Sequence, residues 1–334
     1  MYIVDSYYLA IIFCVITMLC WGSWGNTQKL SSQKWPFQLY YWDYSFGVLI
    51  ITLLLAFTMG SYGSEGRSFL IDLNQAENKY IFYALIGGII FNFANLLLVI
   101  AIDIAGMAIA FPIGIGLALV LGVITNYMYV PEGDPLLLFG GVLFVAFAIV
   151  LDAMAYKQIL SDQRQKAQKG IIISVLAGVA MGFFYKYVAK SMTLDFSSPE
   201  LGKLTPYTAL VIFSLGLLLS NFVFNTINMY KPIAGTPVKY KDYFSMGSPK
   251  LHLIGILGGG IWGLGMSFSI LASEQAGPAI AYGLGQGATM VAAFWGIFIW
   301  KELKDLPKSK NWMLYLMFVF FLIGLGLIIY SKID

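Results

Sequence analysis

Charged residues, histidine and cysteine are all scarce in this sequence. Only 11% of its 334 residues are charged, whereas about 25% is typical of soluble domains. Apolar residues make up 59%, against about 45–50% in soluble proteins. A soluble fold of this length has too little interior to bury so much hydrocarbon. We therefore expect lipid to be the solvent for most of the chain.

The scarcity of these residues also excludes several classes of protein. One histidine, His252, cannot form a multi-histidine metal site, and with scattered carboxylates it supplies no catalytic constellation. Cys14 and Cys20 fall in the same apolar segment and indicate no disulfide framework. The net charge of +3 is spread over short loops, unlike the basic face of a nucleic-acid binder. We expect no enzyme, metal, cofactor or nucleic-acid partner.

Ten apolar stretches are long enough to cross a bilayer, which requires about 20 residues per helix. These runs are too long for membrane β-strands and lack the alternation of a β-barrel. The sequence therefore predicts an all-α integral membrane protein with ten transmembrane helices. In order, the expected spans are residues 8–29, 38–60, 79–101, 105–129, 135–157, 170–190, 203–229, 250–272, 277–300 and 311–331.

The positions of lysine and arginine predict the orientation of these helices. The loops after the first, fifth, seventh and ninth predicted helices hold 14 of the 20 basic residues, and the opposite side holds six. Basic residues are enriched in cytoplasmic loops. We therefore expect a multi-pass protein of the cell (inner) membrane with both termini outside.

The sequence also contains an internal repeat. A shift of 171 residues places the third and fourth predicted helices on the eighth and ninth without a gap. The matched positions include Gly87 and Gly258, Gly88 and Gly259, Phe91 and Trp262, Asp103 and Glu274, and residues 106–116 and 277–287. Five helices per repeat give the halves, residues 1–160 and 161–334, opposite orientations in one transmembrane domain. Inverted repeats are typical of alternating-access carriers, whose site lies near the midplane.

Short motifs carry a resemblance to known families. The five-plus-five arrangement and the Trp-Gly-Ser in residues 21–24 are similar to the drug/metabolite transporter superfamily. Within it, residues 1–6 (MYIVDS), residues 21–24 (WGSW) and residues 40–47 (YYWDYSFG) resemble the ureide permeases. The glucose/ribose porters are similar to a lesser degree. The resemblance implies a carrier for ureides or nucleobases. The loop at 157–169 is shorter than in plant ureide permeases and lacks Gly-x-x-x-x-Gly-Lys, which removes any argument for nucleotide control.

Polar and tryptophan side chains near the predicted midplane are candidates for solute binding, because polar groups are costly there. Asparagine and glutamine offer donors and acceptors, and tryptophan offers a flat wall, so the pocket would suit a neutral, flat or ring-shaped polar solute. The alternative role is hydrogen bonding between helices. Lys186 is a further candidate, as a gate or contact, unless it reaches the interface. The candidates are Trp21, Asn92, Asn95, Trp262, Gln286 and Lys186.

Two carboxylates within the apolar segments are candidates for proton coupling. Asp43 lies about one turn inside the second predicted helix, and Asp152 lies about one turn inside the fifth. A carboxyl group in a medium of low dielectric can carry a proton. Either residue could instead anchor a helix end by pairing with a nearby lysine. Asp43 is the first candidate, because it lies in the segment that resembles the ureide permeases.

The sequence thus predicts a secondary active transporter for uptake of a small neutral metabolite, ureide-like or nucleobase-like and coupled to protons. Its partners would be that solute, protons and membrane lipid. The alternatives are a sugar or nucleoside porter and a metabolite or drug exporter. The first helix lacks the carboxylate that exporters of cationic drugs use. A channel fits the inverted repeat less well, and a membrane-embedded enzyme is the weakest alternative.

Overall fold

The computed structural model describes residues 1–31, 34–105, 107–158, 164–233 and 235–333. Within these ranges the regular structure is helical, apart from one isolated bridge between Met192 and Leu204. The α-helices are α1 (Tyr7–Ser23), α2 (Gly25–Ser31), α3 (Phe37–Phe57), α4 (Phe69–Gln75), α5 (Asn78–Ala105), α6 (Met107–Tyr127), α7 (Pro135–Lys157), α8 (Arg164–Ser191), α9 (Pro206–Tyr230), α10 (Tyr240–Ser245), α11 (Pro249–Ala276), α12 (Pro278–Gly285), α13 (Ala288–Phe294) and α14 (Trp312–Tyr330). A π-helical turn, η1 (Trp295–Ile299), follows α13, and a 3₁₀ turn, η2 (Lys308–Lys310), precedes α14.

Nine segments of the described residues are long and apolar enough to cross a membrane. Nine of the ten predicted spans each overlap one of them, and the prediction of a multi-pass all-helical protein is confirmed. The span predicted at 105–129 corresponds to α6, whose described apolar stretch, Ile113–Tyr127, is shorter. The count of ten crossings therefore stays a prediction. The nine segments are Tyr7–Ser31, Phe37–Phe57, Asn78–Ile102, Pro135–Lys157, Gln168–Ser191, Pro206–Tyr230, Pro249–Ala276, Pro278–Ile299 and Lys308–Tyr330.

Proline and capping side chains fix where several of these helices begin. Pro135 and Pro249 each occupy the first turn, where the missing N–H has no helical partner to lose. Asp134 caps the first of these helices by accepting a hydrogen bond from the backbone N–H of Leu137. Gly277 separates α11 from α12 with φ of 82°, a conformation that costs glycine little. The connection between these two helices is therefore a tight turn.

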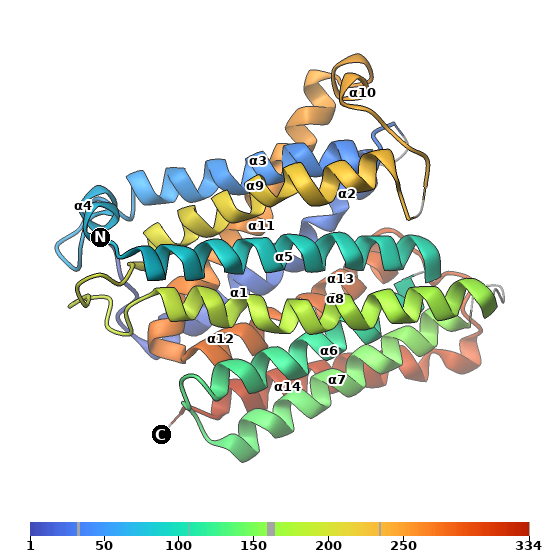
Figure 1. The fold of residues 1–334 in the computed structure, drawn as a ribbon. Helices are drawn as coiled ribbons and strands as arrows, with labels where there is room; N and C mark the ends of the chain where they lie inside the picture. Colours follow the sequence, from blue (N-terminus) through green and yellow to red (C-terminus); the bar gives the residue numbers. More distant parts are fainter. Residues whose placement is uncertain (32–33, 106, 159–163, 234, 334) are drawn as a thin grey trace.

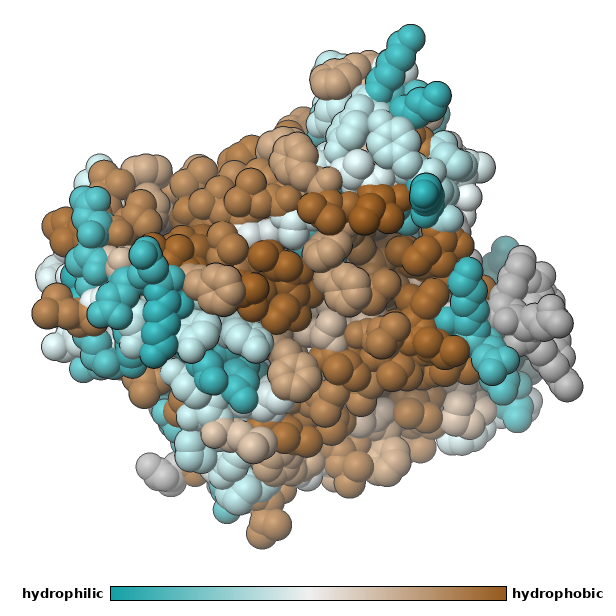
Figure 2. Space-filling view, viewed as in Figure 1, coloured by the Kyte–Doolittle hydropathy of each residue, from teal (hydrophilic) through white to brown (hydrophobic). Residues whose placement is uncertain are grey.

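The long helices run side by side in one bundle, and both chain termini lie at the same end of it (Figure 1). We call this the termini end, and we call the opposite end, with the loops at 231–233, 235–239 and 301–307, the lysine end. The hydroxyl of Tyr7 donates to the carbonyl oxygen of Ile329 at 2.5 Å, which joins the two terminal helices. Apolar side chains cover the middle of the visible face, and hydrophilic ones gather toward its ends (Figure 2). This surface is the one that a bilayer would cover.

Close helix contacts surround the centre of the bundle. α5 packs on α8 and α9, and α11 packs on α1 and α3. Gly88 lets α5 approach the backbone of α9, because an added Cβ would collide with the carbonyl oxygen of Phe213. Gly259 does the same for α11 and α3, where the carbonyl oxygen is that of Tyr44. Small residues replace the hydrophobic driving force that lipid cannot supply.

Candidate functional site

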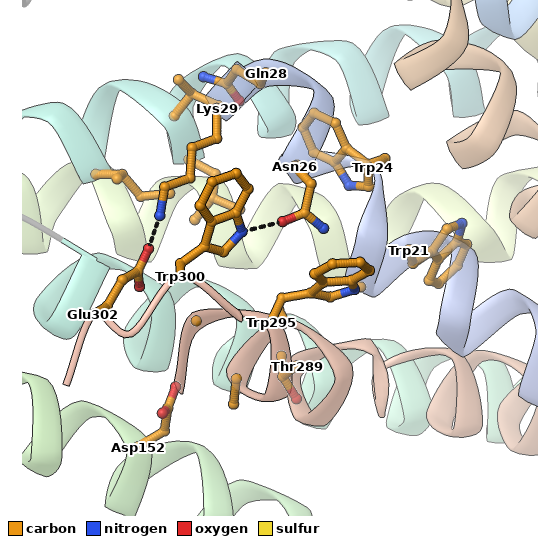
Figure 3. A pocket seen from close by; sticks show the side chains of 18 of the residues that line it. Trp21, Trp24, Asn26, Gln28, Lys29, Asp152, Thr289, Trp295, Trp300 and Glu302 are labelled. Carbon is orange, nitrogen blue, oxygen red and sulfur yellow. Dashed lines mark hydrogen bonds and ion pairs between the residues drawn. The ribbon is translucent and has the colours of Figure 1, made fainter. Parts of the chain in front are cut away.

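A cavity of about 340 Å³ lies between the segments α1–α2, α5, α7 and α13–η1, toward the lysine end (Figure 3). Volumes of roughly 300–1,000 Å³ are typical of small-molecule sites. Its walls are mostly aromatic and aliphatic, with a few convergent polar groups. The lining residues include Trp21, Trp24, Asn26, Lys29, Asn95, Leu98, Val99, Ile102, Asp152, Tyr156, Thr289, Ala293, Trp295, Gly296, Trp300 and Glu302.

Three polar contacts tie α1–α2 to the segment around η1 and form one wall of the cavity. Trp295 Nε1 donates to Ser23 Oγ at 2.9 Å, and Trp300 Nε1 donates to Asn26 Oδ1 at 2.6 Å. Lys29 forms an ion pair with Glu302, which Figure 3 shows at the same wall. The indole N–H groups are thereby satisfied. Lys29 Nζ also lies over the ring of Trp300, 4.4 Å from its centroid, in a cation–π contact that fixes this ring in the wall.

Two carboxylates occupy this cavity in different surroundings. Glu302 pairs with Lys29 and accepts a hydrogen bond from the hydroxyl of Tyr156 at 2.5 Å. Asp152 Oδ1 is buried, and no group among the described residues donates to it. A buried oxygen without a donor is costly, so it is available to accept a hydrogen bond from a bound molecule or to take a proton.

A stack of aromatic rings lies next to the cavity at the side of Trp21, which Figure 3 shows opposite Glu302. The rings of Trp21 and Trp262 are nearly parallel, with centroids 5.8 Å apart and an interplanar angle of 8°. Trp262 also stacks on Phe91 at 4.2 Å and on Phe213 at 6.1 Å. Four helices contribute to this stack: α1, α5, α9 and α11.

Three of the residues predicted from the sequence line the cavity: Trp21, Asn95 and Asp152. Asn95 Nδ2 donates to the hydroxyl of Tyr41 at 3.1 Å, which orients its amide. Trp262 lies behind Trp21 in the aromatic stack rather than in the cavity wall.

The other predicted residues lie outside the set that lines this cavity. Asn92 faces α9, where its Nδ2 donates to Ser220 Oγ at 2.8 Å, a contact between helices. Gln286 is buried at the break between α12 and α13, and its backbone carbonyl accepts from Thr289, which does line the cavity. Lys186 is half-buried on α8. Asn92 and Asn95, three residues apart on α5, thus contact different neighbours.

Asp43 lies outside the cavity, in a cluster formed by the start of α3, by α10 and by the start of α11. Its carboxylate accepts hydrogen bonds from Tyr243 at 2.5 Å and Trp35 Nε1 at 3.2 Å. His252 Nδ1 lies 3.0 Å from Oδ1 and 3.1 Å from Oδ2, which places the ring proton on Nδ1. Burial and the adjacent carboxylate raise the pKa of Tyr243, so its phenol stays protonated as the donor. Gly255 leaves the space that Asp43 occupies.

Sequence reasoning missed the residues nearest the lysine end of the cavity, above all Trp295, Trp300 and Glu302. The sequence predicts polar side chains at the midplane, whereas this cavity extends toward a helix end. The contact between His252 and Asp43 joins residues that are far apart in the sequence and that no motif links. A usable signal was the tryptophan spacing of three at Trp21 and Trp24, which places both rings near one face.

Several apolar helices long enough to cross a membrane, arranged around a mostly apolar cavity with a few polar groups, are typical of a membrane transporter. A sequence model of the ureide permease family matches residues 40–171 and 167–331. The chain belongs to the ureide permease family. Its relatives are named as permeases, which confirms that the protein is a transporter and not an enzyme.

Curated relatives match along nearly the whole chain. Ureide permease 1 of Arabidopsis thaliana is 21% identical over 389 aligned positions, covering 99% of each chain. Ureide permease 2 of the same plant is also 21% identical, again with 99% of each chain covered. These alignments are longer than the chain, so the plant relatives carry insertions that this protein lacks. A protein of known crystal structure shares the fold, with a TM-score of 0.60, 13% identity and 95% of each chain covered.

Proposed function

We propose that this protein carries a neutral ureide, or a related small metabolite, through the cavity between α1–α2, α5, α7 and α13–η1. The names of its relatives support the solute class. The residues support it as well: the indole rings of Trp295 and Trp300 line the cavity, with Lys29 over the ring of Trp300, and Asn26 and Asn95 add amide groups. A ureide presents N–H donors and carbonyl acceptors in one plane, which is the complement of such a site.

The single observation that carries this proposal is the unpartnered oxygen of Asp152. The charges of Lys29 and Glu302 balance each other, so Asp152 supplies the remaining acidic group of the cavity. Asp152 can accept a hydrogen bond from a ureido N–H. A solute carboxylate would instead be repelled by the carboxylate of Asp152 in a site that excludes water. We infer that the neutral cyclic ureides bind and that their anionic open-chain forms do not.

The mechanism that we propose is alternating access of two inverted five-helix repeats, as in the drug/metabolite transporter superfamily. The 171-residue shift of the sequence supports this mechanism, because the shift places α5 on α11 and α6 on α12–α13. The helix contacts exchange in the same way: α5 packs on α8 and α9, as α11 packs on α1 and α3. Two helices also pack on their own counterparts in the other half, α3 on α9 and α7 on α14. Such contacts are expected where a two-fold axis relates the halves. The boundary between the two repeats after residue 160 and the placement of both chain termini outside the cell are parts of this proposal.

We propose uptake driven by protons, with Asp152 as the coupling residue in preference to Asp43. Asp152 lies in the cavity, where solute and proton can influence each other directly. Asp43 lies outside it and already has Tyr243 and Trp35 as donors, so a proton there would disrupt existing hydrogen bonds. A carboxyl group whose oxygen has no donor gains most from protonation or from a solute.

The test is uptake of radiolabelled allantoin, a cyclic ureide, into proteoliposomes that contain the purified protein and an imposed proton gradient. We expect saturable uptake that unlabelled hydantoin and uracil inhibit and that hydantoic acid, an anionic open-chain ureide, inhibits at least tenfold less well. Inhibition by glucose or uridine alone would support the sugar or nucleoside porter instead. Uptake that is indifferent to the gradient would overturn proton coupling but not the solute assignment.

A further inference from the structure

The residues that line the cavity have sequence counterparts near the termini end of the bundle. Cavity residues on α5 correspond, by the shift of 171, to residues on α11, and those on α13–η1 correspond to residues on α6. The pairs are Leu98 with Ser269, Ile102 with Ser273, Thr289 with Ala118, Ala293 with Gly122, and Gly296 with Thr125. If the halves are inverted repeats, these counterparts line the cavity of the opposite conformation.

Two buried tyrosines cover these counterparts. Tyr185, on α8, donates through its hydroxyl to the carbonyl oxygen of Ser269 at 3.0 Å and lies 3.0 Å from its Oγ. Tyr282, on α12, lies within 3.2 Å of the carbonyl oxygen of Ala118 and fills the space beside Gly122, where an added Cβ would collide with its ring. Both tyrosines are 0% exposed. Trp295 and Gly296 line an open cavity, whereas the region of their sequence counterparts on α6 is filled by the ring of Tyr282.

The two tyrosines also contact each other and join helices of both halves. Their ring centroids are 5.3 Å apart, edge to face at 63°. The hydroxyl of Tyr282 is 3.3 Å from the carbonyl oxygen of Met181 on α8, and Thr125 Oγ1 donates to the carbonyl oxygen of Gly182 at 2.9 Å. The closure therefore depends on a few neutral hydrogen bonds and on ring packing. Contacts of this kind can separate without leaving a buried charge unpaired.

We propose that Tyr185 and Tyr282 form the gate at the termini end, and that their separation exposes a second cavity for the same neutral ureide, lined by Ala118, Gly122, Thr125, Ser269 and Ser273. The solute class in this statement depends on the function proposed above, whereas the gate depends only on the contacts and the repeat. Removal of the two hydroxyls should bias the protein toward opening at the termini end and closing at the lysine end.

Thiol labelling can follow both ends of the molecule without any transport assay. In a background with Cys14→Ala and Cys20→Ala, two matched reporters are Ser273→Cys for the gated region and Ile102→Cys for its cavity counterpart. Each is labelled with a membrane-impermeant maleimide in intact cells and in inside-out vesicles. The gate variant is Tyr185→Phe combined with Tyr282→Phe, which keeps both rings. The carbonyl acceptors of Ser269, Ala118 and Met181 lie within helices, so the fold should persist although the Ser269 hydroxyl loses one partner.

We expect the gate variant to increase labelling of the Ser273→Cys reporter by about tenfold, the size of shift that a few neutral hydrogen bonds produce in a two-state equilibrium. Labelling of the Ile102→Cys reporter should fall, and it should occur from the opposite side of the membrane. Tyr207→Phe is the matched control, because it removes a hydroxyl that donates to Tyr2 at the termini end, away from this gate. It should leave both rates unchanged.

Unchanged labelling of the Ser273→Cys reporter, in a gate variant whose Ile102→Cys reporter still reacts, would overturn the gate. A rise at both positions would show loosening of the whole bundle and would also overturn it. Allantoin should alter the labelling rates in the parent protein. If the gate variant shifts the rates as expected but allantoin has no effect on them, the gate stands and the ureide assignment fails.

Discussion

Phe91 and Trp262 stack face to face, with ring centroids 4.2 Å apart, and a shift of the sequence by 171 residues places one on the other. In the proposed arrangement of inverted repeats, two equivalent residues touch in this way only near the axis that relates the repeats. That arrangement places the pair where the environment changes least when the two halves exchange conformations. Trp21 extends the stack to the cavity wall, and we propose that these rings are the barrier between the cavity and the opposite side.

Removal of the central ring should weaken both the fold and the barrier. Trp262 is 5% exposed, and truncation of a buried tryptophan to alanine costs about 3–5 kcal/mol. We expect Trp262→Ala to lower the melting temperature and to allow allantoin to leak through proteoliposomes without a gradient, whereas Trp262→Phe keeps the barrier. Normal accumulation by Trp262→Ala would show that the stack is not the barrier.

Neutralisation of Asp152 should separate accumulation from exchange. Asp152→Asn keeps a hydrogen-bonding oxygen but cannot carry a proton, so accumulation of allantoin in a proton gradient should be lost. Exchange of labelled for unlabelled allantoin should continue, because it needs no net proton movement. Asp43→Asn is the matched comparison, and it should instead lower the melting temperature, since hydrogen bonds to a charged group contribute about 1.5–3 kcal/mol each. If Asp43→Asn is the variant that loses only accumulation, Asp43 carries the proton.

The tryptophan at the lysine end should contribute to affinity through its ring more than through its N–H. Trp300→Ala removes the ring from the cavity wall, and we expect the KM for allantoin to rise about tenfold, as the loss of an aromatic contact and its buried area implies. Trp300→Phe loses the hydrogen bond to Asn26 but keeps a flat face, so its KM should change by less than about threefold. Equal effects of the two variants would indicate that Trp300 acts by tying α2 to η1.

Neighbouring glycines on α11 provide a test of helix packing. An added Cβ at Gly259 would collide with the carbonyl oxygen of Tyr44, whereas at Gly260 it would meet no atom within 4 Å. Gly259→Ala should destabilise the protein by about 1–3 kcal/mol through overpacking. Gly260→Ala should be neutral or stabilising by up to about 1 kcal/mol, because alanine is the better helix former. The check is the thermal unfolding of both variants in detergent, and equal melting temperatures would contradict the close approach of α3 and α11.

The sequence by itself determined that the chain is a multi-pass helical membrane protein and a transporter. Hydropathy decides this locally, because each span must satisfy its own backbone hydrogen bonds in lipid. The motifs at residues 21–24 and 40–47 indicated the ureide permease family, to which the chain belongs. The inverted repeat and the placement of the termini remain predictions.

Only the tertiary structure decided which polar residues meet. Helices that are apolar on nearly all sides carry little information about which face points inward, so equal depth could not separate Asn95, in the cavity wall, from Asn92, against Ser220. Asp43 and His252 are far apart in sequence, and α3 and α11 bring them to 3.0 Å. Asp152 and Glu302 share one cavity because α7 and the segment after η1 converge at the lysine end. Depth in the membrane follows from local sequence, whereas the rotation and pairing of helices follow from packing between distant segments.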